Sequence, residues 1–287
     1  MLLVYKGDSV GPWLIKQAKA AGVFAVNVFP DCSPHAYGSK LRDAIGEYDL
    51  VISTKSFHPE AWRRIYGYSN ACVFVPHGYD PSVHYWPYPS NRHDFDIVLA
   101  ANWRPEYHAL MHSFATRVCG LPLQVAIAGS GWHLHQMEFP RGWRFISQVI
   151  GREYVAFLRS GRIVIAPVQQ DVMIGGVRQP GDQDSTRTYE IAAAHCFMLH
   201  RRTAYVSTIF DERQEVPLWD DATELAALVR YYLPRDDERR AMAAWAHARA
   251  VPLYSASNRA VQVLDHIRTA MAARYKDSLE SCRIDAT

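Results

Sequence analysis

The residues best suited to chemistry lie between positions 182 and 190. A hydroxyl side chain in this segment can cap a helix that begins there. Because a helix N-terminus attracts anions, we expect it to present Thr186, Arg187 and Thr188 to a phosphate. Glu190 lies about one turn further along, where a carboxylate can accept hydrogen bonds from both hydroxyls of a ribose. The alternative is an ordinary capped helix on whose surface Glu190 pairs with Arg187.

Two short patterns raise the question of a metal. Asp182-Gln183-Asp184 has the D-x-D spacing of a metal–nucleotide motif found in another transferase fold, but this triplet is common by chance. His133 and His135 could face the same side of a strand, yet no third ligand follows at a suitable spacing. We therefore expect no metal site and no cofactor. The chain also lacks the G-x-S-x-G, P-loop, H-E-x-x-H and G-x-G-x-x-G motifs, which excludes the usual signatures of hydrolases, P-loop NTPases, zincins and dinucleotide-binding enzymes.

A second candidate phosphate contact follows a strand predicted at residues 96–101. Asn102, Trp103 and Arg104 come directly after it and precede a helix whose first residue is Pro105. In open parallel sheets ligands bind outside the carboxyl ends of the strands. Arg104 adds a forked donor to the positive end of the helix, which suits a phosphate. The alternative is a simple turn in which Asn102 caps the helix and Arg104 is solvated.

A glycine-rich turn follows the next predicted strand, at residues 123–128. It reads Gly129-Ser130-Gly131-Trp132. Glycine at both positions permits a close approach of the backbone to a ligand, and Trp132 could form a wall of the pocket. A plain tight turn is the alternative.

The elements that position these residues alternate between short apolar runs and amphipathic stretches. This pattern predicts an α/β fold with two Rossmann-like parallel sheets, the N-terminal one short or truncated. Residues 81–93, rich in proline and without helical or strand periodicity, are the predicted linker. A loop is predicted at residues 169–185. We predict a partial domain at residues 1–85, a second domain at 94–255, and a C-terminal helix and tail at 256–287.

Composition excludes several classes of protein. The 31 Lys and Arg against 29 Asp and Glu give a net charge of +2, too small to hold a nucleic acid backbone. No apolar run approaches the length of a spanning helix, so we expect no membrane span. The five cysteines are widely spaced without a C-x-x-C pair, which favours a reducing, cytoplasmic location.

Several motifs, taken in order, resemble the GT-B glycosyltransferases, in particular the group similar to the spore maturation protein CgeB. Residues 76–80 resemble that family's P-x-G-x-D, Gly129 to Trp132 its G-x-G-W, and Arg187 to Glu190 its R-T-x-E. Acidic segments at 220–225 and 236–240 and a long final helix also fit. The resemblance covers residues from about 71 to 268.

The resemblance implies transfer of a sugar from a nucleoside-diphosphate sugar to an acceptor, without an essential metal, in a cleft between two domains. Glu190 would hold the ribose, and Arg187, Thr188 and Arg104 the diphosphate. The 129–132 loop would pack near the nucleotide, and the base would lie by Gln148 and Val149. In related retaining enzymes a carboxylate eight positions before the ribose glutamate faces the donor sugar. Here Asp182 holds that position.

The N-terminal half departs from the family because only about four strands precede the linker. Within it we consider Asp31 and His77 for acceptor contact or base catalysis. Asp31 could instead cap a turn, and His77 could be a hinge residue bonded to backbone. A short first domain would expose a sheet edge, so a homo-oligomer is a further expectation.

Two other functions remain open at this point. An enzyme of the same fold could epimerise a nucleotide-sugar, which also breaks the bond to the nucleotide. Alternatively, a chain with a shortened first domain could bind a nucleotide-sugar or a partner without turnover. A transferase releases free nucleotide only when an acceptor is present. Measuring this release with and without an acceptor therefore distinguishes a transferase from both alternatives.

Overall fold

The protein, as a computed structural model, is described for residues 1–34, 39–174 and 176–284. It divides into two compact units. Unit 1 combines Met1–Pro76, Gln170–Asp182 and Ser257–Thr287, and unit 2 combines His77–Gln169 and Gln183–Ala256. Each unit contains a parallel sheet with helices between successive strands, as the alternating sequence pattern predicts. Among the described residues, no helix is both long and apolar enough to cross a membrane.

Unit 1 is built on a four-stranded parallel sheet of order β1-β2-β3-β4. Proline in the first turn of α1 and α3 fits the backbone that a helix start requires. The strands are β1 (Leu2–Tyr5), β2 (Ala25–Phe29), β3 (Leu50–Ser53) and β4 (Ala71–Phe74), and the helical segments are α1 (Pro12–Ala20), α2 (Ser39–Ala44), the 3₁₀ turn η2 (Ile45–Glu47) and α3 (His58–Tyr66).

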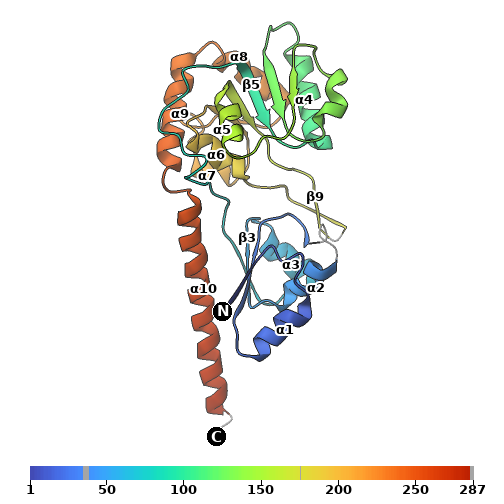
Figure 1. Ribbon diagram of the computed structural model, residues 1–287, viewed down its shortest axis with the longest axis vertical. Coiled ribbons are helices and arrows are strands. Elements are labelled where there is room, and N and C mark those ends of the chain that lie inside the picture. Colours follow the sequence, from blue (N-terminus) through green and yellow to red (C-terminus); the bar gives the residue numbers. More distant parts are fainter. Residues whose placement is uncertain (35–38, 175, 285–287) are drawn as a thin grey trace. The chain divides into compact units, whose positions relative to one another are not determined.

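Successive side chains along each strand point to opposite faces of this sheet, and apolar side chains lie on both faces. One face packs against α1, α2 and α3, with Trp62 fully buried in that core. The other packs against α10 (Ala256–Ile284), whose Ile267 lies among Val26, Leu50 and Ile52. Figure 1 shows α10 on the side of the sheet opposite α1 and α3. The final helix is therefore part of unit 1 rather than a separate C-terminal segment, because its apolar stripe completes this core.

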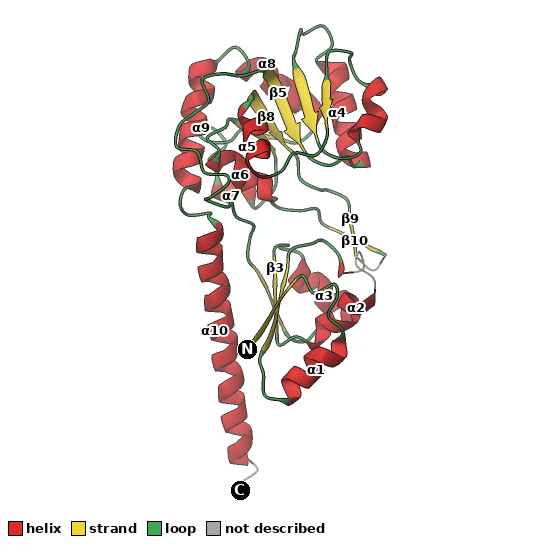
Figure 2. Ribbon diagram, in the orientation of Figure 1, coloured by secondary structure: helices red, strands yellow, loops and turns green. Residues whose placement is uncertain are grey.

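A β-hairpin replaces part of the loop predicted at residues 169–185. Strands β9 (Val172–Ile174) and β10 (Val177–Gln179) pair antiparallel (Figure 2). Val172 and Ile174 are buried in the core of unit 1, and Arg64 of α3 donates a hydrogen bond of 3.1 Å to Gln179. The loop prediction was wrong here because these strands are three residues long, too short to show periodicity.

Unit 2 is built on a six-stranded parallel sheet of order β12-β11-β8-β5-β6-β7. Its strands are apolar and largely buried because helices cover both faces. The strands are β5 (Phe95–Ala100), β6 (Val125–Ala128), β7 (Arg144–Ile146), β8 (Gly161–Ala166), β11 (Met198–Arg201) and β12 (Leu218–Trp219).

The two faces of this sheet have different helical covers. One core includes apolar side chains of α4 and α8, and the other those of α5, α6 and α7, while α9 contributes to both. The helical elements are α4 (Pro105–Arg117), the 3₁₀ turn η3 (Trp132–Glu138), α5 (Gly151–Arg159), α6 (Thr186–Ala193), α7 (Val206–Ile209), α8 (Ala222–Tyr232) and α9 (Asp236–Ala250). The strand expected to carry His133 and His135 is η3 instead.

The proline-rich segment predicted as a linker is packed against unit 2. The Arg159 guanidinium lies 4.6 Å from the Trp86 ring centre, and the Tyr85 ring stacks on His247. The Trp86 amide also donates to the Ala193 carbonyl at 3.0 Å. The division between the units therefore falls at Pro76 and His77, before the segment in which the sequence placed it.

The buried imidazole of His58 makes the stability of unit 1 sensitive to acid. It is fully enclosed, its Nε2 donates to the Cys32 carbonyl at 2.8 Å, and its Nδ1 accepts from the Ser53 hydroxyl at 2.6 Å. Burial lowers its pKa to about 3. The ring is therefore neutral in the folded protein over the whole range in which an unfolded histidine becomes charged.

We expect stability to fall as the pH decreases from about 6.5 toward 3, because there the unfolded chain binds a proton that folded His58 does not. One such histidine contributes up to about 1.4 kcal/mol per pH unit to the free energy of unfolding. His58→Gln should reduce this slope in urea titrations at successive pH values, whereas His112→Gln, at an exposed site, should not. An unchanged slope in the His58 variant would contradict the assignment.

Candidate functional site

Three neighbouring strands of unit 2 end at the same level. Ala100 of β5 pairs with Ala128 of β6, which pairs with Ile146 of β7. The ladder continues into the loops, since the Ala101 amide donates to Ala128 and the Gly129 amide to Ile146. Parallel strands thus bring three sequence-predicted segments, at 102–104, 129–132 and 147–149, to one edge of the sheet.

The first two of these loops are in backbone contact. Gly129 has φ +148°, and a Cβ added there would lie 2.1 Å from the carbonyl oxygen of Ala101. The Asn102 side-chain oxygen accepts from the Ser130 amide at 3.1 Å, and the Trp103 amide donates to the Ser130 carbonyl at 2.8 Å. Glycine at 129 is therefore required by the packing of one loop on the other.

A cavity of about 150 Å³ opens where these loops meet. Five sequence-predicted residues line it together: Asn102, Gly129, Gln148, Val149 and Arg187. The remaining lining comes from Ala100, Ala101, Ala128 and Tyr154. Ligand pockets for a whole drug-sized molecule are usually about 300 Å³ or more, so this cavity can enclose one portion of a larger ligand.

Arg187 supplies the positive charge of the cavity. It stands in the first turn of α6, and its Nη2 donates to the Pro167 carbonyl at 3.0 Å. That bond holds the guanidinium in place. Its Nε is buried and has no hydrogen-bond partner within the described part of the chain. A guanidinium held in place at the cavity favours an anionic ligand group such as a phosphate.

Glu190 lies one helical turn beyond Arg187 and is held by two residues that sequence reasoning missed. Its carboxylate accepts a hydrogen bond of 2.8 Å from the Tyr154 hydroxyl, and His84 Nε2 lies 3.7 Å from its other oxygen. Burial, and then the charge of Glu190, raises the pKa of Tyr154, which keeps this hydroxyl protonated as a donor. Tyr154 also lines the cavity, so the hydrogen bond from its hydroxyl places the Glu190 carboxylate next to a residue of the cavity wall. No local pattern in the sequence marks Tyr154 or His84.

Two predictions, those for Trp132 and Thr188, need correction because these side chains pack in the core. Trp132 is fully buried and its Nε1 donates to the Ala101 carbonyl at 2.7 Å, so it packs in the core rather than forming a pocket wall. Thr188 is also fully buried, and its hydroxyl lies 2.8 Å from His200 Nε2 and accepts from the Ser185 amide. Gly131, with φ +88°, packs closely on the Trp103 side chain.

Arg104 and Thr186 lie at the starts of α4 and α6 and are exposed. Neither is part of the lining of the cavity. Their positions at helix N-termini leave them accessible to a ligand that extends beyond the cavity.

The three predicted catalytic residues are not brought together within either unit. Asp31 and Asp182 belong to unit 1, whereas His77 is the first residue of unit 2. Asp31 forms an ion pair of 3.5 Å with Lys6. Asp182 is buried and lies 3.1 Å from the ammonium of Lys55, which follows β3. The carboxylate predicted to face a sugar therefore anchors the hairpin segment to the four-stranded sheet.

Comparison with known proteins places the chain in a class. The model of the glycosyl transferase-like family matches residues 104–265, more than half of the chain. The chain therefore belongs to the glycosyl transferase-like family. No curated protein matches it. The comparisons do not reach the CgeB-like group, so that finer resemblance stays a prediction.

Solved structures show the same fold at low sequence identity. Sucrose-phosphate synthase from Thermosynechococcus elongatus is 15% identical with a TM-score of 0.63, covering 91% of this chain and 72% of that one. HepE from Anabaena in complex with UDP-glucose is 14% identical with a TM-score of 0.65, covering 93% and 78%. The pneumococcal O-GlcNAc transferase GtfA is 12% identical with a TM-score of 0.60, covering 94% and 57%. With two parallel-sheet units, the chain has the GT-B type of α/β fold.

Gly129→Ala should destabilise unit 2 and distort the cavity, because the added methyl would overlap the Ala101 carbonyl at a φ that alanine avoids. We expect a loss of about 2 kcal/mol or more in urea unfolding. Gly142→Ala, where no atom lies within 4 Å of the added Cβ, is the matched control and should change stability little. Equal stability of the two variants would show that the loop contact is unimportant.

Asp182→Ala should lower the stability of unit 1 by about 3 kcal/mol, because it removes the carboxylate that faces the buried Lys55 ammonium. Asp171→Ala, which breaks an exposed pair with Arg178 at the same hairpin, should cost less than about 1 kcal/mol. Urea unfolding of both variants measures the difference. If Asp182→Ala is as stable as the wild-type protein, the Asp182 carboxylate has no structural role.

Proposed function

We propose that the protein transfers a sugar from a nucleoside-diphosphate sugar, with the nucleotide portion bound at the unit 2 cavity. The observation that carries the proposal is Arg187, the cation among the residues that line the cavity at the carboxyl ends of β5, β6 and β7. Ligands of open parallel sheets bind at this edge. The membership of the glycosyl transferase-like family and the UDP-glucose in the HepE structure support the same ligand class.

The lining residues suggest how a nucleotide would lie. Gln148 offers an amide that can donate to and accept from the edge of a base, and Val149 an apolar contact for its face. The Glu190 carboxylate, held by Tyr154, would accept the ribose hydroxyls. Arg187 would bind the diphosphate, with the exposed Arg104 at the start of α4 as a second cation.

In the proposed reaction, the bond between the anomeric carbon and a diphosphate oxygen breaks while an acceptor hydroxyl bonds to that carbon. The leaving diphosphate gains negative charge, which Arg187 and the N-terminus of α6 would stabilise. Because these groups supply positive charge at the cavity, the proposal requires no metal there. The acceptor hydroxyl loses its proton, and Asp31 and His77 remain our candidate acceptors of it.

Arg187→Ala should weaken UDP binding by about tenfold or more, because it removes a charge-assisted hydrogen bond to phosphate. Arg213→Ala, at an exposed site elsewhere in unit 2, should leave the affinity unchanged. Isothermal titration with UDP, GDP, dTDP and ADP measures the effect and identifies the base. Equal nucleotide affinity of wild type and the Arg187 variant would remove the proposal.

Turnover then separates a transferase from the other two functions. We expect the protein to release free nucleotide from its nucleotide-sugar in proportion to added acceptor. Release without any acceptor would favour an epimerase-like reaction, and tight nucleotide-sugar binding with no release under any condition would favour a binding role.

A further inference from the structure

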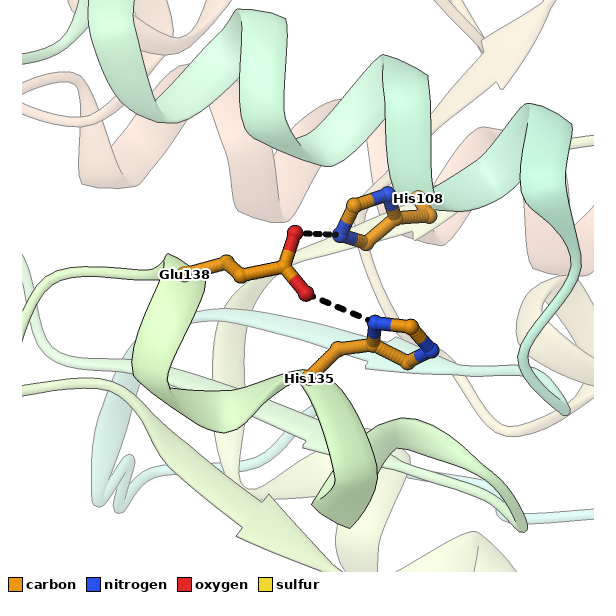
Figure 3. A group of neighbouring side chains, drawn as sticks. All are labelled: His108, His135 and Glu138. Atoms are coloured by element: carbon orange, nitrogen blue, oxygen red, sulfur yellow. Dashed lines mark hydrogen bonds and ion pairs between the residues drawn. The ribbon is translucent and has the colours of Figure 1, made fainter.

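Three potential metal ligands converge on one side of unit 2, away from the cavity lining. They are His108 on α4 and His135 and Glu138 on η3 (Figure 3). Their ligand atoms all lie within 4.8 Å of one another. Figure 3 shows both imidazoles turned toward the Glu138 carboxylate, one on each of its oxygens. A shared point between two nitrogens and a carboxylate is an arrangement that metal ions occupy.

The separations are close to those that a single ion requires. His108 Nε2 lies 3.0 Å from one oxygen of Glu138, and His135 Nδ1 lies 2.8 Å from the other. Ligand atoms bound to one zinc ion at about 2.0–2.2 Å are about 3.0–3.5 Å apart. Only a small outward movement of the exposed Glu138 side chain is needed to admit an ion. This movement breaks the hydrogen bond between His135 and Glu138, and bonds from both side chains to the ion replace it.

The nitrogen of His108 is a second, independent indication. Its Nε2 is buried but has no hydrogen-bond partner among the residues that the structure describes. The contact with Glu138 meets the distance of an ion pair without the geometry of a hydrogen bond. Buried polar atoms in proteins are nearly always satisfied, so a nitrogen left in this state beside a carboxylate oxygen favours a ligand between them.

The surrounding aromatic rings hold the two imidazoles in position. The Trp103 ring stacks on His135 with a centroid distance of 4.6 Å and an interplanar angle of 3°. The Phe139 ring meets His108 edge to face at 5.4 Å. Rings fixed in this way lose little additional conformational freedom when they bind an ion.

We propose that His108, His135 and Glu138 form a binding site for a divalent transition-metal ion, with Zn²⁺ as the ion that this donor set favours. Two imidazoles and one carboxylate are established zinc ligands, and a water molecule would complete four-coordination. No thiolate contributes, so the site is distinct from structural cysteine–zinc sites. It is also separate from the proposed transfer chemistry, since none of the three residues lines the cavity.

A metal ion at this site would connect α4, which carries His108, to η3, which carries His135 and Glu138. His108 lies four residues after Arg104 on α4, and η3 follows directly on Gly131. A bound ion would join these elements by bonds much stronger than the present contacts. We therefore expect Zn²⁺ to stabilise unit 2, because a ligand that binds only the folded state raises its stability.

The experiment titrates Zn²⁺ into chelator-treated full-length protein and measures binding by calorimetry and thermal stability by unfolding scans. We expect one zinc site per chain and a rise in the melting temperature. His108→Ala, His135→Ala and Glu138→Gln should each weaken binding by about tenfold or more, since even groups that only support a ligand cost 10–100-fold when removed. The matched control is His133→Ala, an exposed histidine on the same turn, which should retain full affinity.

Co²⁺ substitution tests the geometry independently of stability. Visible d–d bands of a nitrogen- and oxygen-ligated four- or five-coordinate ion should appear at one equivalent and be lost in the His108 and His135 variants. Circular dichroism of each variant establishes that it is folded before titration. Binding of the same strength in His133→Ala, His108→Ala and His135→Ala would overturn the proposal, as would the absence of any zinc binding by the wild-type protein.

Discussion

The in-register pairing of β5, β6 and β7 is the constraint on which the candidate site depends. Hydrogen bonds fix Ala100, Ala128 and Ile146 at one level, so the three following loops emerge together. Gly129 then allows the second loop to contact the backbone of the first, at a separation that any side chain would prevent. The cavity exists because these backbones are close, and its lining comes from whatever residues follow the strands.

The same two loops serve a different purpose on their other side. Trp103 contacts Gly131 and stacks on His135, while its neighbour Asn102 lines the cavity. The backbone contact that shapes the cavity thus also sets the spacing of the His108, His135 and Glu138 cluster. An ion bound there would stiffen the loops without entering the space that the nucleotide is proposed to occupy.

Unit 1 depends on segments that are far apart along the chain. The hairpin brings Val172 and Ile174 into its core, and α10 closes the opposite face with Ile267. The ion pair between Asp182 and Lys55 lies at the end of the hairpin segment and is almost completely buried. A buried charge is costly without a partner, so this pair specifies where the chain leaves unit 1. The ion pair gives Asp182 a structural role at a position where the family resemblance predicts a catalytic carboxylate.

Apolar strands and helix starts leave local patterns, so the parallel α/β class, most strand positions and the residues that follow β5, β6 and β7 could be predicted from the sequence. It also singled out Arg187 and Glu190 at the start of α6. Only the tertiary structure assigned Tyr154 to Glu190, buried Trp132 and Thr188 in the core, and brought His108 to His135 and Glu138. These outcomes depend on contacts between residues distant in the chain, and such contacts have no local periodicity for a sequence pattern to report.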